Sequence, residues 1–539
     1  MARSVSAPRV VVLGGGYVAI WLVRRLRHAV RRGLIELTVI DQHNYHTFHG
    51  LIPELLVGKI QAAQVISPSR RLFAPGRYIC AEVEQILVEQ KEVVYTRALD
   101  GQPQRIAYDH LIINLGSVDD LKRYRGIGEH TMRLKNYFDC LRVRNHLLAM
   151  LEIAETETDP IERRRLLHFV IAGGNYAGIE VAAELAEFLD DLTGRDFRHI
   201  NREECRVTVV HSGNQILPEL GRRFPRLSAH AANVLRQRGV SLELGVRLKS
   251  ATPLDAVLSD GRRLDTRTII SCTGTAQSPL LEQLPFPRDR GGRLIADACG
   301  RVSVEHNIWS AGDCAAVPMK NGEPAPPLAL YAMQGGAMLG KNILRTITGR
   351  PLQPYSFTGM GDCCVLGFGQ AVGQLWGMPL QGLPAWLVWR ACMIAYLPAW
   401  SKRIRTLLDW MTGPFLGREI TSVETSGQTG VVRELYETGQ TIVREGDIGR
   451  SMYLIQSGSV EVVAGGPDGE KQLAVLGSGS HFGEIAVLQN VRRTATVRAL
   501  EPVTLLRISR DETRELSTTF KPFAELAGSL PQPLPPHSG

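Results

Sequence analysis

The stretch Val10-Val11-Val12-Leu13-Gly14-Gly15-Gly16-Tyr17-Val18-Ala19 decides the fold of the N-terminal part of the chain. Its four leading apolar residues predict a buried strand, and a helical pattern follows the glycines from 20 to 28. A second apolar run, 37–40, ends at Asp41. A strand, a Gly-rich turn, a helix and an acidic residue after the next strand are typical of a dinucleotide-binding fold.

Each residue of this motif has an expected role. Gly14 allows the tight turn, Gly16 lets the backbone approach a pyrophosphate at the helix N-terminus, and Ala19 permits close packing of helix on strand. Asp41 is expected to accept hydrogen bonds from a ribose. Taken alone, the motif is also compatible with a Gly-rich turn of an unrelated α/β fold.

The same design recurs at 169–180, where Phe-Val-Ile-Ala-Gly-Gly-Asn-Tyr-Ala-Gly-Ile-Glu again passes from strand to turn to helix. Two such folds in one chain predict two bound nucleotides and a tandem Rossmann-like α/β architecture. Between them lies the apolar run 108–117, and after them 307–315, which contains Gly312 and Asp313.

With these motifs the chain resembles the flavoproteins that have two dinucleotide-binding domains. In that superfamily a Gly-Asp pair after a strand carries the carboxylate that bonds the ribityl hydroxyls of the flavin, and Asp313 matches it. The resemblance implies an FAD site formed by Gly14, Gly15, Gly16, Ala19, Asp41, Val83, Gly116, Gly312 and Asp313. It implies an NAD(P)H site formed by Gly173, Gly174, Gly178, His211 and Gly274.

Within that superfamily, residues 8 to 415 are most similar to the type II NADH:quinone oxidoreductases. The segments that follow that family's order are 44–48, 66–68, 178–180 with Glu184, and 326–329 before Gln334. The resemblance implies that NAD(P)H reduces FAD and that a quinone or another small acceptor reoxidises it. It places Glu180 near the flavin as a catalytic proton relay and Gln334 at the quinone.

The chain departs from the family pattern at two places in the second motif. Asn175 stands where the middle glycine is expected, although Asn tolerates the left-handed backbone conformation. The strand 206–210 ends in His211-Ser212 where an NADH-specific site carries an acidic residue. Three interpretations stay open: His211, Ser212 and a nearby Arg accept the 2′-phosphate of NADPH, NADH binds weakly, or the site is degenerate.

The acceptor side has alternatives too. The run 329–334 keeps only one of the two glutamines of the family's motif, and Glu180 also suits a helix N-terminus electrostatically. A sulfide:quinone reductase would need two redox cysteines, such as Cys140 with Cys363 or Cys364. An isolated Cys is more often a small buried apolar residue, which disfavours that alternative.

Five of the seven Trp lie between 376 and 410, beside the basic run 402–405. This segment predicts helices that lie in a membrane interface with cationic residues toward anionic lipid. The alternative is a packed helical hairpin that forms a homodimer interface or caps the flavin domain.

A different module follows a polar linker at 417–429. Short β-like runs punctuated by glycines predict a β jelly roll, and 482–488 with 492–497 resembles the phosphate-binding cassette of cyclic-nucleotide-binding domains. The resemblance implies that Arg493 binds the cyclic phosphate, that Glu484 accepts the ribose 2′-hydroxyl, and that Gly483 and Ile485 present backbone N–H groups. Thr494 follows the matched Arg, and in eukaryotic relatives a Thr here accompanies cGMP preference, so the ligand is cAMP or cGMP.

The 539 residues are therefore expected to divide as follows: 1–165 and 291–375 for the FAD domain, 166–290 for the NAD(P)H domain, 376–416 for the membrane or dimer segment, 417–429 for the linker, 430–527 for the cyclic-nucleotide domain, and 528–539 for a disordered Pro-rich tail. Residues 429–539 hold 11 basic and 13 acidic residues, which leaves 51 basic and 41 acidic residues upstream. The flavoprotein part thus carries a net charge of +10 and the C-terminal part −2, which together give +8, and no basic-aromatic motif predicts nucleic acid as a partner.

Nine dispersed Cys without a C-x-x-C pair argue against a disulfide framework or a zinc site and for a reducing compartment. No signal peptide and no stretch of about 20 apolar residues is seen. We therefore expect a peripheral protein on the cytoplasmic face of the inner or plasma membrane. The rival function is a cyclic-nucleotide-binding regulatory protein whose flavoprotein half is non-catalytic or uses another electron donor or acceptor.

Overall fold

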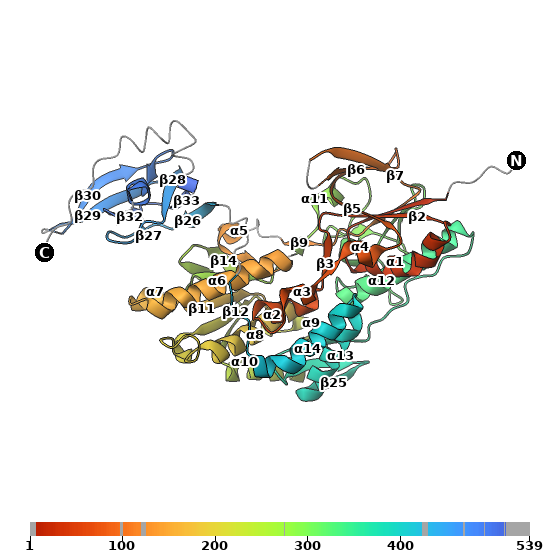
Figure 1. Cartoon of the computed structure of the whole chain (residues 1–539), viewed down its shortest axis with the longest axis horizontal. Helices are drawn as coiled ribbons and strands as arrows, with labels where there is room; N and C mark the ends of the chain where they lie inside the picture. The colour runs from red at the N-terminus through yellow and green to blue at the C-terminus, as the bar shows by residue number, and fades with distance from the viewer. Residues whose placement is uncertain are drawn as a thin grey trace.

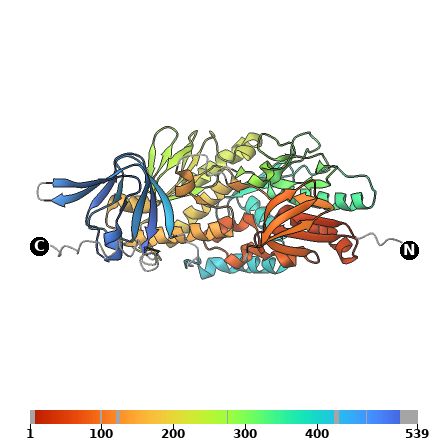
Figure 2. The same ribbon diagram turned by 90° about the horizontal axis from the view of Figure 1, so that it is seen from above.

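The computed structural model describes residues 7–97, 101–119, 126–273, 275–422, 430–466, 469–489, 491–510 and 512–513. The molecule is elongated, with the N-terminal sheet at one end and the C-terminal β-domain at the other (Figure 1). Seen from above, the second α/β domain lies between them (Figure 2). The expected tail and the end of the expected cyclic-nucleotide domain fall outside the described residues.

The first domain is built on an eight-stranded sheet of order β20-β21-β8-β1-β2-β5-β6-β7. Its central strands are parallel and buried on both faces, as a doubly covered sheet requires. The strands are β1 (Arg9–Leu13), β2 (Glu36–Asp41), β5 (Arg77–Leu87), β6 (Glu92–Arg97), β7 (Pro103–Ala107), β8 (His110–Ile113), β20 (Arg301–Ser303) and β21 (Ile308–Ser310).

Two helices cover one face of this sheet, α1 (Tyr17–Arg31) and α12 (Ala329–Ile347). They approach closely because glycines of α12 face α1. A Cβ on Gly336 would lie 2.1 Å from the carbonyl oxygen of Val18, and one on Gly340 would lie 2.9 Å from that of Leu22. This contact fixes the start of α12 beside the first glycine motif.

The second domain has a five-stranded parallel sheet of order β10-β17-β11-β12-β13. The strands are β10 (Met132–Arg133), β11 (His168–Ala172), β12 (Arg206–His211), β13 (Val240–Leu244) and β17 (Thr268–Ser271). Its helices are α6 (Tyr137–Thr156), α7 (Pro160–Leu166), α8 (Tyr176–Leu192), α9 (Pro218–Arg223) and α10 (Pro225–Gln237). The tandem Rossmann-like architecture expected from the two glycine motifs is confirmed.

Two small antiparallel sheets flank this core. The first, β14 (Leu248–Ala251), β15 (Asp255–Leu258) and β16 (Arg263–Asp265), is inserted between β13 and β17. The second, β23 (Gly361–Val365), β24 (Ala371–Leu375) and β25 (Met378–Gln381), leads into α13 (Leu383–Tyr396) and α14 (Trp400–Leu416). Within the described residues, no helix is long and apolar enough to cross a membrane.

The C-terminal domain consists of two four-stranded antiparallel sheets, β26-β33-β28-β31 and β27-β32-β29-β30, which agrees with the expected jelly roll. Its elements are β26 (Val431–Tyr436), β27 (Thr441–Val443), β28 (Ser451–Ser457), β29 (Val460–Gly466), β30 (Gly469–Leu476), β31 (His481–Phe482), α15 (Glu484–Leu488), β32 (Thr496–Ala499) and β33 (Val503–Ser509). Tyr436, Ile455 and Val460 belong to its core.

The remaining short elements connect these layers. They are β3 (Tyr45–Thr47), η1 (His49–Leu51), α2 (Ile52–Leu56), α3 (Ala62–Val65), β4 (Ile66–Pro68), α4 (Ser69–Phe73), β9 (Val118–Asp119), α5 (Ile127–His130), η2 (Arg202–Glu204), β18 (Thr275–Ala276), α11 (Pro279–Glu282), β19 (Leu294–Ile295), η3 (Gly312–Cys314) and β22 (Ala315–Ala316).

Candidate functional site

The first glycine motif forms a turn that only glycine fits. Gly14 has φ +90°, and a Cβ there would lie 2.5 Å from the carbonyl oxygen of Asn114. Gly16 is the N-cap of α1, and a Cβ on it would meet nothing within 4 Å. The space in front of the helix N-terminus is therefore open, and no side chain of the described residues caps it. Such an end suits a pyrophosphate.

Asp41 is fixed at the end of β2 by two backbone donors. Its carboxylate accepts hydrogen bonds from the N–H of Gly15 at 2.6 Å and of His43 at 2.8 Å. Burial raises the pKa of Asp41, and the two N–H donors counteract this increase. Ala19 packs in the core against the sheet, so its small size serves the packing expected of it.

Asp313 lies at the first turn after β21, where Gly312 has φ +77° and a Cβ would lie 2.9 Å from Val18 Cγ2. The Asp313 carboxylate accepts a hydrogen bond from Ser117 Oγ at 3.0 Å, and Ser117 Oγ accepts one from Lys135 Nζ at 3.0 Å. Ser117 follows Gly116 of the expected set. Val83 lies on β5 and packs at the edge of a core cluster.

Several polar side chains here have no partner among the described residues. Both amide atoms of Asn114 and Nε2 of His46 are buried without a hydrogen bond. Burial lowers the pKa of His46 to about 3 and that of His49 to about 4, so both rings are neutral. Asn114 and His46 lie within the segments 108–117 and 44–48 but were assigned no role from the sequence, and His49 and Lys135 were not singled out, since only the tertiary fold brings these residues to the glycine motif. Unsatisfied buried groups of this kind indicate a ligand or ordered water.

The second glycine motif also forms a turn at a helix N-terminus, but the expectation for the backbone of Asn175 is wrong. Asn175 has φ −81° and ψ −178°, so it is not in the left-handed conformation that we invoked for it. It is the N-cap of α8: its Oδ1 accepts a hydrogen bond from Gly178 N–H at 3.0 Å and its Nδ2 donates to Cys272 O at 2.9 Å. A Cβ on Gly173 would lie 2.8 Å from Cys272 O. Gly274 lies outside the described residues.

His211 ends β12, and its Nδ1 accepts a hydrogen bond from the N–H of Gly174 at 3.2 Å. The proton is therefore assigned to Nε2, which is buried and has no partner among the described residues. Burial lowers the pKa of His211, and within the described chain no carboxylate or Arg contributes to that shift.

Glu180 lies on the first turn and a half of α8 and accepts a hydrogen bond from Val365 N–H at 3.2 Å. Burial raises its pKa to about 8, and the charges of Glu184 and Glu54 add to the increase. Each of these neighbours has its own cation, Lys59 at 2.7 Å from Glu184 and Arg390 at 3.0 Å from Glu54. Among the described ion pairs, none involves Glu180.

Gln334 is half-buried on α12, two residues beyond Ala332, which lies against Gly312. It is therefore on the helix that borders the first nucleotide site. Burial raises the pKa of Cys140, Cys363 and Cys364, which keeps all three as thiols. The raised thiol pKa values further disfavour the chemistry of a sulfide:quinone reductase. Separately, no group of described residues is arranged to hold a metal ion.

The Trp-rich segment has side chains that pack inward around Arg390 and others that face outward on α14. Arg390, which interrupts the apolar run of α13, lies over the ring of Trp410 at 3.9 Å and over that of Trp386 at 4.6 Å, and it pairs with Glu54. The outer face of α14 carries exposed apolar side chains at helical spacing: Trp400, Ile404, Leu407, Leu408, Met411 and Phe415. We call these six residues the apolar stripe.

The predicted phosphate-binding cassette lies around α15 of the C-terminal domain. Arg493 is 7% exposed and donates hydrogen bonds to the carbonyl oxygens of Gly483 at 2.8 Å and Ser451 at 2.7 Å. Gly483 has φ +85°, and a Cβ there would lie 2.4 Å from Arg493 Nη1. Glu484 Oε2 is buried without a partner among the described residues, Ile485 is in the same turn, and Thr494 is exposed.

Two Rossmann-like folds in tandem, each with a glycine turn at the N-terminus of a helix, are typical of nucleotide-dependent oxidoreductases. A family model described as pyridine nucleotide-disulphide oxidoreductase matches residues 8–336, and a model of the cyclic nucleotide-binding domain matches residues 433–519. This chain belongs to the pyridine nucleotide-disulphide oxidoreductase family, and it carries a C-terminal cyclic nucleotide-binding domain.

Relatives agree with the resemblance to type II NADH:quinone oxidoreductases. A probable NADH dehydrogenase of Dictyostelium discoideum is 27% identical over 78% of this chain and 92% of its own length. The type II NADH:quinone oxidoreductase Ndh of Mycobacterium tuberculosis is 25% identical over 75% of this chain and 87% of its own length. The structure of NDH2 from Plasmodium falciparum in complex with NADH has a TM-score of 0.71 at 18% identity over 77% of this chain and 99% of that one, which shows a shared fold.

Proposed function

We propose that this protein is an FAD-dependent NADH:quinone oxidoreductase that works at a membrane surface and is regulated by a cyclic nucleotide. The named activities of the relatives and the two glycine motifs support the first part. The cyclic nucleotide-binding family match supports the second. The relatives match over most of their own length, so the proposal concerns the whole reaction rather than one half of it.

The environment of Glu180 carries the proposed chemistry, because burial and the charges of Glu184 and Glu54 raise its pKa. Reduction of a quinone consumes protons, and a carboxyl group whose pKa is raised to about 8 holds one at neutral pH. Glu180 lies on the helix that begins at the second glycine motif and is bonded to Val365 of β23, next to α13. It is therefore suited to give a proton to an acceptor that enters from the side of α13 and α14.

The residues of the first domain fit FAD. Gly14 allows the tight turn and Gly16 leaves the helix N-terminus open for a pyrophosphate. Asp41 is proposed to accept from a ribose, and Asp313, which accepts a hydrogen bond from Ser117, is proposed to accept from polyol hydroxyls. The unpartnered amide of Asn114 supplies a further donor and acceptor. When bound, the flavin supplies hydride and single-electron chemistry, while these residues hold and orient it. The neutral His46 and His49 add no charge to the site.

The second glycine motif is proposed to hold the pyridine nucleotide through Gly173, Gly174 and Gly178. His211 presents an N–H donor rather than a carboxylate, so it does not repel a phosphate and does not accept from ribose hydroxyls. Both NADH and NADPH are therefore proposed as electron donors. Gln334, on the helix beside Gly312, is proposed to lie near the quinone.

The apolar stripe supports docking on a membrane surface. Trp400 is 70% exposed and Phe415 is 87% exposed, and the basic residues Lys402, Arg403 and Arg405 lie on the same helix. An apolar face beside basic residues favours an anionic interface. We propose the cytoplasmic face of the inner or plasma membrane. A homodimer formed through the same stripe is the competing arrangement.

In the C-terminal domain, Arg493 and Glu484 are proposed to bind the cyclic phosphate and the ribose hydroxyl of cAMP or cGMP. The unpartnered Oε2 of Glu484 supports this role, because a buried carboxylate oxygen calls for a donor. Thr494 is exposed and free to contact phosphate or base.

A single preparation tests the enzyme function. The purified protein is expected to carry an oxidised flavin whose absorbance near the visible maximum bleaches anaerobically with NADH or NADPH and returns when a soluble quinone is added. A flavin that stays oxidised with both nucleotides would contradict the proposal. That result would favour a second function, a cyclic-nucleotide-binding protein with a non-catalytic flavoprotein half, for which the lack of an acidic residue at His211 is the supporting observation.

A further inference from the structure

The C-terminal domain contacts the pyridine nucleotide domain through an edge strand. β26 lies at the edge of its sheet, with β33 on one side. The backbone N–H of Leu435 on β26 donates to Nε2 of His130 in α5 at 2.7 Å. Burial lowers the pKa of His130 to about 4, so the ring is neutral and can accept. The contact satisfies one backbone N–H of this strand edge, which is otherwise a site for unspecific pairing.

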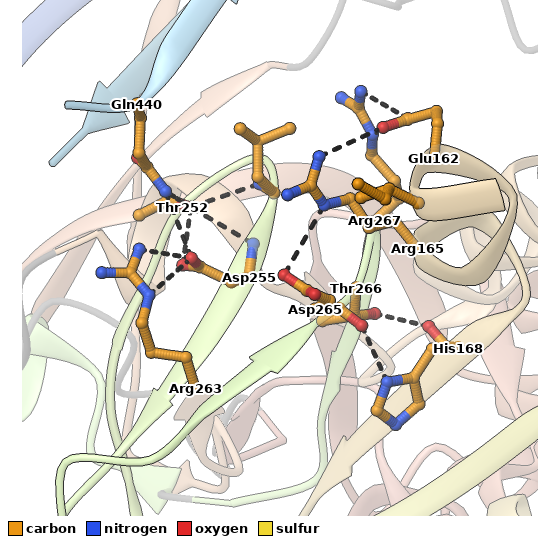
Figure 3. Close-up of polar contacts among 12 residues, drawn as sticks. Glu162, Arg165, His168, Thr252, Asp255, Arg263, Asp265, Thr266, Arg267 and Gln440 are labelled. Carbon is orange, nitrogen blue, oxygen red and sulfur yellow. Dashed lines mark hydrogen bonds and ion pairs between the residues drawn. The ribbon is translucent and has the colours of Figure 1, made fainter. Parts of the chain in front are cut away.

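The turn after β26 adds polar contacts to the small inserted sheet. Gln440 Nε2 donates to Thr252 Oγ1 at 3.3 Å and to Asp255 Oδ2 at 3.2 Å, as Figure 3 shows. Arg444 Nη1 pairs with Asp159 at 3.1 Å at the start of α7. Leu254, which precedes Asp255 in the small inserted sheet, packs its side chain against the apolar core of the C-terminal domain. The contact therefore combines buried apolar surface with charged and neutral hydrogen bonds.

On the C-terminal side, a chain of hydrogen bonds connects this contact to the cassette. Arg493 donates to the carbonyl oxygen of Ser451, whose Oγ accepts from Arg507 Nη1 at 3.3 Å. Arg507 Nε donates to Glu434 Oε1 at 2.7 Å, and Tyr436 Oη donates to Glu434 Oε2 at 3.0 Å. Glu434 is buried and lies on the same strand β26 that meets α5.

On the other side, the contact leads to the second glycine motif. β14 follows Val246, whose N–H donates to the carbonyl oxygen of His211 at 3.2 Å. The core beneath the small sheet includes Val170 and Ala172 of β11, and Val210 of β12. β11 is also held at its start, where His168 Nδ1 contacts Asp265 O at 2.8 Å (Figure 3). These are the strands that end at Gly173 and His211.

We infer that cyclic-nucleotide binding at Arg493 acts on the affinity for the pyridine nucleotide, through β26 and the sheet β14–β16, rather than on the acceptor side through the linker and the membrane-facing helices. The inference rests on the proposed function, since it assigns the regulation of that site. A cyclic phosphate that accepts from Arg493 competes with the Ser451 carbonyl for the same guanidinium. The two sites are coupled if the contact between the two domains differs between the chain with bound cyclic nucleotide and the chain without it.

The test uses the full chain. Steady-state KM values for NADH and for a soluble quinone are measured with and without saturating cAMP or cGMP, and calorimetry measures binding. We expect the KM for NADH to change about fivefold or more while the KM for the quinone stays constant. Because binding linkage is reciprocal, saturating NAD⁺ is expected to shift the Kd of the cyclic nucleotide by a similar factor.

The Gln440→Ala/Arg444→Ala double variant removes contacts to the small sheet and α7 without touching the cassette. It is expected to bind the cyclic nucleotide with unchanged Kd and to lose the effect on the KM for NADH. The matched control is Lys471→Ala/Gln472→Ala on the exposed strand β30, which should respond like the wild type.

Four results would overturn the inference, and they separate it from the proposed function. If the double variant binds and responds fully, or if the quinone KM is the one that changes, the sensor stands and the route is wrong. If the wild-type chain binds but neither KM changes, no coupling exists. If calorimetry detects no binding of either nucleotide to the wild-type chain, the sensor role itself fails and the inference falls with it.

Discussion

The N–H of Gly174 donates to His211 Nδ1 at 3.2 Å, and this contact repeats in the second domain the one that Gly15 makes with Asp41 at 2.6 Å in the first. The two contacts are equivalent in position but opposite in what they offer a ligand. Asp41 has carboxylate oxygens, which accept hydrogen bonds, whereas the free ring nitrogen of His211 carries an N–H, which donates. The second site therefore lacks the charge that separates NADH from NADPH.

The first prediction concerns donor selectivity. The His211→Asp variant is expected to lower the KM for NADH about tenfold and to raise that for NADPH, because a carboxylate accepts from ribose hydroxyls and repels a 2′-phosphate. The measurement is the ratio of kcat/KM for the two nucleotides. A ratio equal to that of the wild type would mean that the adenosine ribose does not lie beside His211.

The second prediction concerns Glu180 and pH. Because its pKa is raised to about 8, the carboxyl group is protonated below that pH and loses its proton as the pH rises through it. Quinone reduction is therefore expected to fall as the pH rises through about 8, while reduction of the flavin by NADH is not. Stopped-flow measurement of the two half-reactions separates them.

The Glu180→Gln variant should lose that inflection and slow quinone reduction about 100-fold. The exposed Glu203→Gln substitution is the matched control and should keep both. An unchanged pH profile in Glu180→Gln would assign the proton to another group.

The third prediction concerns the membrane. Replacing Leu407, Leu408 and Met411 of the apolar stripe by Ser is expected to reduce flotation with anionic phosphatidylglycerol vesicles at least about tenfold, since each buried apolar side chain contributes about 1.5–3 kcal/mol. Leu473→Ser/Val475→Ser removes exposed apolar side chains from β30 and should float normally. If the stripe variant still floats but changes its oligomeric state in sedimentation, the stripe is a dimer interface instead.

The fourth prediction concerns the effector. Arg493→Ala in the full chain is expected to weaken binding of cAMP or cGMP at least about tenfold, because a charge-assisted contact to phosphate is lost. The neighbouring exposed Arg492→Ala should bind normally in the same calorimetric titration. Equal affinities of Arg493→Ala and wild type would reject the assigned phosphate contact.

The fifth prediction concerns the helix pair that positions the first site. Gly336→Ala places a Cβ 2.1 Å from Val18 O, and this overpacking is expected to destabilise the protein by about 1–3 kcal/mol. Gly413→Ala in α14 meets nothing nearer than 4.0 Å and should be neutral or stabilising. Calorimetric Tm values compare them, and an unchanged Tm for Gly336→Ala would mean that α12 shifts freely.

The sequence by itself determined the modules and their order. Gly14 to Asp41, Gly173 to Glu180, and Gly483 to Arg493 are local motifs, because a tight turn, a helix N-terminus and a following strand are specified by adjacent residues. The Gly-Asp pair that follows an apolar run likewise predicted the position of Asp313 after a strand. It also showed that an acidic residue is missing at His211.

Only the tertiary structure decided how the modules act on one another. The buried pairing of Arg390 with Glu54, the proximity of Glu180 to Glu54, and the contact of Leu435 with His130 join residues more than a hundred positions apart. Their pKa values and partners depend on burial and on packing between domains. Neither is encoded in the spacing of nearby residues, so the sequence alone could not place them.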